Sequence, residues 1–252
     1  MSELSKALRE RAEDSISQLR RAVAEFKNVC YANSLGSESV VLTDLIWGAA
    51  PDLGAKLDPE IDIFSIDTGR LYPETYDLID RIQQRYGRSL TIFYPQAEDL
   101  EGWVGKNGIN GFRDGLEQRR GCCGIRKVEP FRRALAGRSA WVTGIRRGQS
   151  ASRALAAPVE WDGVYGLHKV SPLLDWSENE IWEYIRKKRL PYNTLHDSGF
   201  PSIGCAPCTR AVQPGEDARS GRWWWERSDS RECGLHPRRQ TAGLAAVGAP
   251  KQ

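Results

Sequence analysis

The segment that decides the fold is Val29-Cys30-Tyr31-Ala32-Asn33-Ser34-Leu35-Gly36-Ser37-Glu38-Ser39, which the apolar stretch Val40–Trp47 follows. Its apolar first half predicts a short buried strand over 29–34, followed by a turn of small residues and then a helix. The backbone N–H groups at the start of such a helix bind anions well, because the positive end of the helix dipole lies there. The turn is not a Walker motif, and an ordinary loop in which Ser37 caps the helix fits the same residues.

Strands and helices continue to alternate after this segment. The apolar pattern predicts further strands over 61–66, 90–94, 140–144 and 167–171. It predicts helices over 3–26, 73–86, 126–135 and 177–188, whereas residues 96–120 are polar and Gly-rich and carry no clear strand. This alternation is typical of an α/β fold with a mostly parallel sheet and helices on both faces.

Three turns follow predicted strands directly, at Ser34–Ser39, Asp67–Arg70 and Gly144–Arg147. The carboxyl ends of parallel strands meet at one edge of a sheet, and ligands bind in the crevice outside that edge. We therefore expect the three turns to contribute to a single ligand site.

Four of the six cysteines form two pairs, the adjacent Cys122 and Cys123 and the Cys205-Ala206-Pro207-Cys208 motif. Adjacent cysteines rarely reach the geometry of a disulfide with each other. Four thiolates can hold either zinc or an iron–sulfur cluster. A zinc module usually takes its ligands from two short knuckles, so the unspaced first pair and the long separation between the pairs favour the cluster. Buried or incidental thiols are the alternative.

The overall charge is small, because the chain has 36 basic and 33 acidic residues and therefore a net charge of +3. Such a balance does not indicate nucleic-acid binding. The basic residues instead gather beside Gly-rich turns, which indicates a small anionic ligand. No apolar run is long enough for a membrane span, and the N-terminus lacks a signal-peptide core, so we expect a cytoplasmic protein with no membrane contact. A homo-oligomer is compatible with the sequence.

The chain changes character after Cys208, where it becomes polar, Arg-rich and Gly-rich. We predict an α/β domain over 1–208 and a C-terminal tail over 209–252 that is partly flexible. The tail contains Arg231-Glu232-Cys233-Gly234-Leu235-His236. A cysteine in an accessible basic segment should have a depressed pKa and react readily. A surface thiol without function is the alternative.

The two cysteine pairs together with Glu232-Cys233-Gly234-Leu235-His236 resemble the assimilatory adenylyl-sulfate (APS) reductases of the sulfonucleotide reductase family. The resemblance covers nearly the whole chain. The cluster-free phosphoadenylyl-sulfate (PAPS) reductases of that family share the terminal motif and the Asp-Thr-Gly turn but lack both cysteine pairs. The resemblance implies an adenine nucleotide α-hydrolase-like, Rossmann-like fold. It also implies a [4Fe–4S] cluster held by Cys122, Cys123, Cys205 and Cys208.

The resemblance further implies a reaction in two steps, as part of sulfate assimilation and cysteine biosynthesis. The Cys233 thiolate attacks the sulfate sulfur of APS and AMP leaves, which gives an S-sulfocysteine. Thioredoxin or a similar dithiol then attacks this intermediate and releases sulfite. In this family the cluster is not expected to pass electrons to the substrate.

Several substrate contacts are implied by the same resemblance. Attack on a negatively charged sulfate needs cations that offset the repulsion. The cations that would face the phosphosulfate are Lys127, Arg219 and Arg222. The remaining implied contacts are Ser34 and Gly36 in the first turn, Gly144 and Arg153 near the nucleotide, and His236 as a hydrogen-bonding group.

Three alternatives stay open. PAPS is a possible second substrate, because the sequence does not exclude a pocket that accepts a 3′-phosphate. An ATP-dependent RNA thiolation enzyme can combine a pyrophosphate loop with a cluster, but Leu35 and Glu38 replace a Gly and the Asp of that loop. A non-enzymatic module with a four-thiolate zinc site is the third, and analysis for iron, sulfide and zinc separates it from the reductase.

Overall fold

The computed structural model describes residues 4–48, 61–149, 153–226 and Leu235. Cys233 and His236 lie outside the described residues, so their predicted roles are not addressed by the fold. None of the helices in the described part of the chain combines the length and the apolar character that crossing a bilayer requires.

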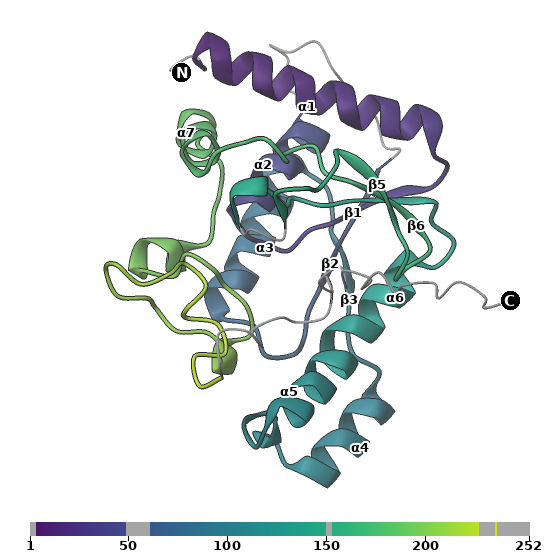
Figure 1. The fold of residues 1–252 in the computed structure, drawn as a ribbon, viewed down its shortest axis with the longest axis vertical. Helices are drawn as coiled ribbons and strands as arrows, with labels where there is room; N and C mark the ends of the chain where they lie inside the picture. The colour runs from purple at the N-terminus through teal and green to yellow at the C-terminus, as the bar shows by residue number, and fades with distance from the viewer. Residues whose placement is uncertain (1–3, 49–60, 150–152, 227–234, 236–252) are drawn as a thin grey trace, which may run out of the picture.

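Six strands form one sheet in the order β3-β2-β1-β4-β6-β5. Figure 1 labels all of these strands except β4. The strands are β1 Val29–Ala32, β2 Asp62–Ile66, β3 Thr91–Phe93, β4 Ala140–Val142, β5 Val159–Asp162 and β6 Leu167–Val170. All neighbours pair in parallel except β5, which lies antiparallel to β6 at the edge. The sheet therefore extends on both sides of β1. In such a sheet the ligand-binding crevice lies at the carboxyl ends of the strands where the order reverses, here beside β1 and β4.

The helices are α1 Lys6–Glu25, α2 Ser37–Thr43, α3 Pro73–Tyr86, α4 Ala97–Asn107, α5 Leu116–Cys123, α6 Glu129–Leu135 and α7 Glu178–Lys188. A π-helical turn, η4 Gly124–Val128, joins α5 to α6. Short 3₁₀ turns include η3 Gly111–Arg113 and η8 Ala206–Cys208. Figure 1 shows α1 at one end of the molecule and α4 with α5 at the opposite end.

The two faces of the sheet bury different clusters, because successive strand residues point to opposite sides. Val29 and Tyr31 of β1 belong to a cluster that includes residues of α1, α2, α3 and α7. Cys30, between them, belongs to a second cluster with Phe131 and Leu135 of α6. Helices therefore cover both faces, and the predicted α/β fold with a mostly parallel sheet is confirmed. The prediction that Cys30 is a core residue is also confirmed, since its side chain is fully buried.

Local signals in the sequence predict some element ends well. Helix α3 begins at Pro73 and ends before Gly87, whose φ of 61° suits the left-handed conformation that glycine accepts. The capping box at the start of α7 is present, with the Ser177 hydroxyl accepting from the Glu180 N–H and the Glu180 carboxylate accepting from the Ser177 N–H.

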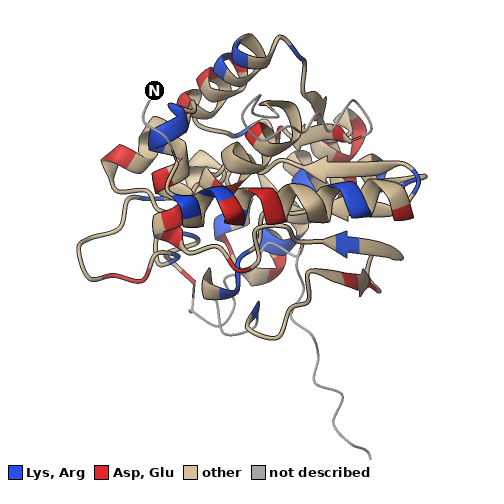
Figure 2. Ribbon diagram, turned by 90° about the horizontal axis from the view of Figure 1, so that it is seen from above, with Lys and Arg blue, Asp and Glu red and all other residues tan. Residues whose placement is uncertain are grey.

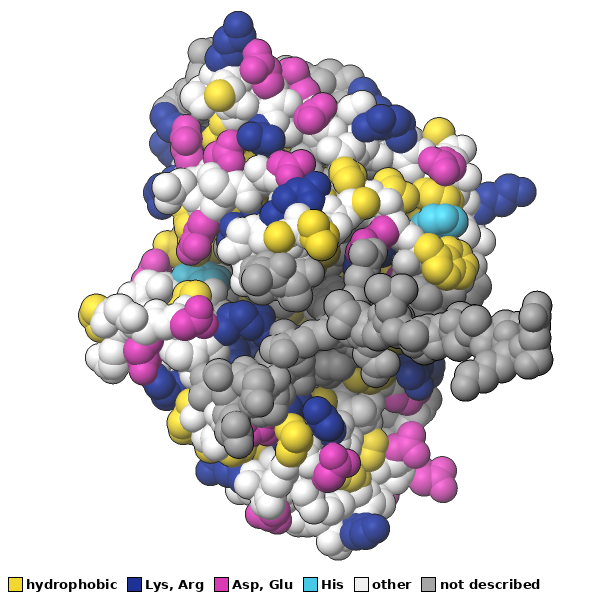
Figure 3. Space-filling view, in the orientation of Figure 1, with side chains coloured by type: hydrophobic (Ala, Val, Ile, Leu, Met, Phe, Trp, Pro, Cys, Tyr) yellow, Lys and Arg dark blue, Asp and Glu magenta, His cyan; other side chains and the backbone are white. Residues whose placement is uncertain are grey.

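Other predictions are wrong in detail. The residue that caps α2 is Gly36, and Ser37 is already the first helical residue. The stretch 96–120 contains no strand, as predicted, but α4 lies within it and α5 begins in it, and neither these two helices nor strand β5 was predicted. Helix α4 buries no residue, so it lacks the periodic apolar face by which a helix is recognised in sequence. Figures 2 and 3 show Lys and Arg interspersed with Asp and Glu over the described surface that they draw, in keeping with the small net charge.

Candidate active site

A cavity of about 460 Å³ lies at the carboxyl ends of β1, β2 and β4. Residues of all three predicted turns line it, so these turns do meet at one site. The described residues that sequence analysis assigned to the substrate all line this cavity: Ser34, Gly36, Lys127, Gly144, Arg153, Arg219 and Arg222. The four paired cysteines line it as well.

The turn between β1 and α2 is held by short polar contacts. The Ser39 hydroxyl accepts from the Ser34 N–H at 3.1 Å and lies 2.8 Å from the Ser34 hydroxyl. The Leu35 N–H donates to the side chain of Asn33 at 2.8 Å, with Leu35 at a φ of 61° that is unusual for this residue type. The first N–H groups of a helix have no acceptor within the helix, so those that follow Gly36 are available to an anion in the cavity.

Glu38 connects this turn to the turn after β4, a role that sequence analysis missed. Its carboxylate accepts from Arg146 Nε at 2.8 Å and from Gln149 Nε2 at 2.9 Å. Arg153 in turn donates to the Gln149 side chain. A Cβ on Gly144 would lie 3.0 Å from the Cβ of Glu38, so a glycine allows this close approach. A sequence signal for the Glu38–Arg146 pair does exist. An acidic residue is unusual in an anion-binding turn, and arginines follow another predicted strand.

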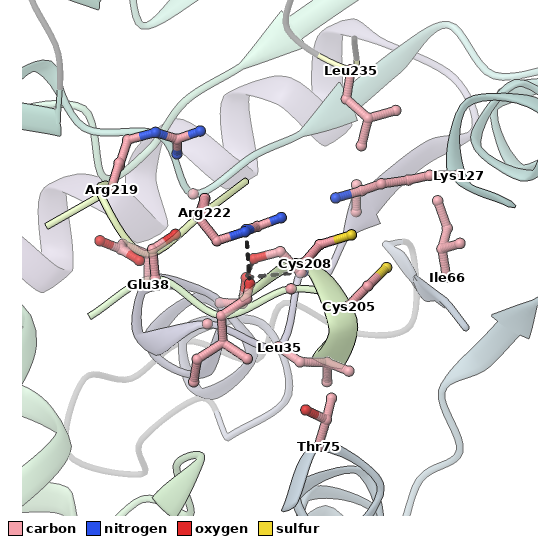
Figure 4. Close-up of a pocket in the computed structure, with 18 of the residues that line it drawn as sticks. Leu35, Glu38, Ile66, Thr75, Lys127, Cys205, Cys208, Arg219, Arg222 and Leu235 are labelled. Atoms are coloured by element: carbon pink, nitrogen blue, oxygen red, sulfur yellow. Dashed lines mark hydrogen bonds between the residues drawn. The ribbon is translucent and has the colours of Figure 1, made fainter. Parts of the chain in front are cut away.

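Three cations reach the cavity from two segments. Lys127 comes from η4, just after the cysteine pair, while Arg219 and Arg222 come from the segment after Cys208. Figure 4 shows the Lys127 amine and the Arg222 guanidinium directed into the same space as the sulfurs of Cys205 and Cys208. Arg222 is 9% exposed, donates to the Ile203 carbonyl at 3.2 Å and lies over the Trp223 ring at 4.6 Å. The cavity is therefore lined by three cations, of which Arg222 is buried.

The four cysteines come together from distant segments. Cys122 and Cys123 end α5, and Cys205 and Cys208 flank and end η8; all four belong to one cluster with Trp223. Burial and the nearby Cys205, Cys123 and Cys122 raise the pKa of the Cys208 thiol to about 12, with Arg222 acting in the opposite direction. The five described cysteines are all free thiols. The convergence that the sequence predicted is therefore present in the fold.

The surroundings of these thiols include buried hydrogen-bond donors. The described part of the chain also leaves three buried N–H groups without an acceptor near the thiols: Arg126 Nε, Arg222 Nε and Trp223 Nε1. An iron–sulfur cluster spreads its thiolates over several irons, and its sulfurs accept hydrogen bonds. The donor set thus suits a [4Fe–4S] group.

Comparisons with known proteins identify the family. The family described as Phosphoadenosine phosphosulfate reductase domain matches residues 28–211. The Adenosine 5'-phosphosulfate reductase of Allochromatium vinosum is 47% identical over 224 residues, which cover 89% of this chain and 84% of that protein. That of Neisseria meningitidis serogroup B is 46% identical over 231 residues, which cover 91% of each chain.

Solved structures show the same fold. The phosphoadenylyl-sulfate reductase of Candida auris, in a phosphate complex, superposes with a TM-score of 0.65 at 27% identity, covering 84% of this chain and 99% of that one. The FMN adenylyltransferase of Candida glabrata superposes with a TM-score of 0.56 at 18% identity, covering 89% and 76%, which shows the fold alone. The fold is the adenine nucleotide α-hydrolase-like fold. From the match over residues 28–211 and the identity to curated relatives over most of its length, the chain belongs to the phosphoadenosine phosphosulfate reductase family.

Proposed function

We propose that this protein reduces adenosine 5'-phosphosulfate to sulfite and releases AMP. The observation that carries the proposal is a single cavity in which an anion-binding turn, three cations and four cysteines meet. The curated relatives that share nearly half of its residues are named Adenosine 5'-phosphosulfate reductases, which supports this substrate.

The first step uses Cys233 as the nucleophile. Its thiolate forms a bond to the sulfate sulfur of APS, while the bond from that sulfur to the phosphate oxygen breaks. AMP leaves with the electron pair of the broken bond, and the product is an S-sulfocysteine. No external electrons are needed in this step. Three arginines close to Cys233 in sequence, Arg231, Arg238 and Arg239, should favour the thiolate form.

The second step needs a dithiol, for which a cytoplasmic thioredoxin is the candidate. One of its thiolates attacks the Cys233 sulfur, and sulfite leaves with the bonding electrons. The second thiol then resolves the mixed disulfide, so the dithiol becomes oxidised and Cys233 returns as a thiol. The two electrons that turn sulfate into sulfite thus come from the dithiol.

The cavity residues prepare the substrate for attack. The Ser34–Gly36 turn would bind the anionic end of the nucleotide, and Gly144 and Arg153 would lie near the nucleotide. Lys127, Arg219 and Arg222 would offset the charge of the phosphosulfate, which otherwise repels a thiolate. His236 would add a hydrogen bond to the same group.

The [4Fe–4S] cluster would be held by Cys122, Cys123, Cys205 and Cys208. When bound, it would supply iron–thiolate bonds that connect α5 to η8 and would add its binding free energy to that of folding. Thr68 supports this site from the turn after β2, since its hydroxyl lies 3.2 Å from the Cys205 sulfur. The attack on the sulfate sulfur would be carried out by Cys233 and assisted by the three cations, not by the cluster.

Replacing any one of the three cations by Ala is expected to lower kcat/KM for APS on the order of a hundredfold. Each would remove a charge-assisted contact to a group whose charge shifts in the transition state. Steady-state sulfite release from Lys127→Ala, Arg219→Ala and Arg222→Ala measures this. Near-normal kcat/KM in all three variants would show that these residues do not face the phosphosulfate.

Gly204→Ala is expected to lower kcat/KM about tenfold while the melting temperature changes little. A Cβ at this position would overlap the guanidinium of Arg222, which is the movable end of a long side chain, so Arg222 shifts and the backbone does not. Gly102→Ala in α4 is the matched control, because a Cβ there meets no atom within 4 Å. If both variants keep wild-type kcat/KM, the position of Arg222 does not matter for turnover.

The substrate is tested by measuring sulfite release from APS and from PAPS side by side, with reduced thioredoxin as the dithiol. We expect APS to be the preferred substrate. PAPS is the second candidate, because the similar Candida auris structure is a PAPS reductase. Release from PAPS alone would assign that activity instead, and no release from either would refute both.

A further inference from the structure

The innermost ion pair of the site region joins Arg119 of α5 to Glu226. Arg119 Nε lies 2.8 Å from one carboxylate oxygen, and Arg119 Nη2 lies 2.9 Å from the other. The two side chains are 1% and 8% exposed, although the residues are 107 positions apart in sequence. Two parallel hydrogen bonds between a guanidinium and a carboxylate fix the position and the orientation of both side chains. Its burial makes the loss of either partner costly, because the remaining charge is then desolvated and uncompensated.

Arg119 also contacts Cys123 of its own helix and the ring of Trp223. Its guanidinium hydrogen-bonds the Cys123 thiol, four residues further along the chain. It lies over the Trp223 ring at 4.7 Å, and Arg222 lies over the same ring at 4.6 Å. One planar group therefore bridges a cysteine of the proposed cluster, a buried indole and Glu226.

The backbone that leads to Glu226 is fixed as well. The Trp223 N–H donates to the Cys208 carbonyl at 3.0 Å, and the Glu226 N–H donates to the Trp223 carbonyl at 2.9 Å. Trp223 has a φ of 44°, a conformation that a bulky residue adopts only where its surroundings enforce it. Glu226 is thus held both through its side chain and through the turn before it.

Glu226 stands seven residues before Cys233 in the sequence. Seven residues span at most about 25 Å when fully extended, so the position of Glu226 limits the region that Cys233 can reach. Attack at sulfur is sensitive to small displacements of the nucleophile. We infer that Arg119 and Glu226 are positioning residues that fix the origin of the Cys233 segment against the helix that carries Cys122 and Cys123. This inference rests on the proposed function.

The test separates positioning from folding and from substrate binding. Glu226→Gln keeps the size of the side chain but removes the charge that Arg119 needs. We expect S-sulfocysteine formation from APS, measured in a single turnover without reductant, to slow at least about tenfold. Iron content, the visible spectrum and the dissociation constant of AMP should stay within about twofold of wild type. Glu226→Asp, which keeps the charge, should recover part of the rate.

Two further variants sharpen the result. Arg119→Lys keeps the charge but loses the fork that reaches both Glu226 and Cys123, so it should slow adduct formation in the same way. Glu216→Gln is the matched control, since it breaks the Arg210–Glu216 pair, which also has two hydrogen bonds but is about a third exposed. This control should react at the wild-type rate.

Three outcomes would overturn the inference. Glu226→Gln with a full iron complement could form the adduct at the wild-type rate. It could lose AMP affinity in proportion to the rate, which would make it a substrate-site residue. Iron loss in both Glu226→Gln and Arg119→Lys would make the pair a support of the cluster only. A wild-type protein that forms no adduct at Cys233 would instead refute the proposed function.

Discussion

Cys233→Ser is expected to abolish sulfite release from APS while the protein keeps its iron and its affinity for AMP. A serine hydroxyl is a far weaker nucleophile than a thiolate at neutral pH, and removing a covalent nucleophile costs a factor on the order of 10⁴ or more in kcat. The proposed cluster ligands and the described substrate residues are elsewhere in the chain, so neither should change. Sulfite assays, iron analysis and AMP titration on one preparation measure all three.

Normal turnover by Cys233→Ser would remove this residue from the mechanism. A variant that lost iron as well as activity would also contradict the account, because it would make Cys233 part of the metal site. The separation of the two properties is therefore the informative result, more than the loss of activity itself.

Cys205→Ser is expected to lose most of its iron and sulfide and to unfold at a temperature roughly 10 °C lower. In the proposed cluster the four thiolates would join α5 to η8, so its binding free energy would also be folding free energy. Losing several kcal/mol of it would shift Tm by about 2–4 °C per kcal/mol in a chain of this size. Iron and acid-labile sulfide analysis, with thermal unfolding, measures the effect.

Cys30→Ala is the matched control for this prediction. Cys30 is fully buried in β1 and belongs to the cluster of residues on the α6 face, so its loss should reduce stability and leave the iron content unchanged. A wild-type protein that holds zinc and no sulfide would contradict the cluster and would favour the four-thiolate zinc module.

The parts of the fold that the sequence predicted are those with a local chemical signal. The strand and turn over 29–39, the Pro73 start of α3 and the capping box at Ser177 each depend on neighbouring residues. Helix α5 shows the opposite case, since its buried residues are Arg119 and Cys122. A helix that buries a charged side chain and a proposed cluster ligand has no apolar stripe, and periodicity cannot reveal it.

The same distinction between local signals and long-range contacts applies to the residues of the site. Unusual residue types in unusual spacing predicted that Cys122, Cys123, Cys205 and Cys208 meet, and the fold brings them together. The pairs Glu38–Arg146 and Arg119–Glu226 were missed, because each joins residues more than a hundred positions apart. In composition a buried arginine looks the same as a solvated one, so only the tertiary structure shows that Arg119 and Arg146 are interior charges.

The most direct test of the account is the mass of the wild-type protein after incubation with APS and no reductant, followed by peptide mapping. We expect a single sulfite-sized addition on the peptide that contains Cys233, which reduced thioredoxin then removes with release of sulfite. No addition, or an addition on any other cysteine, would contradict it.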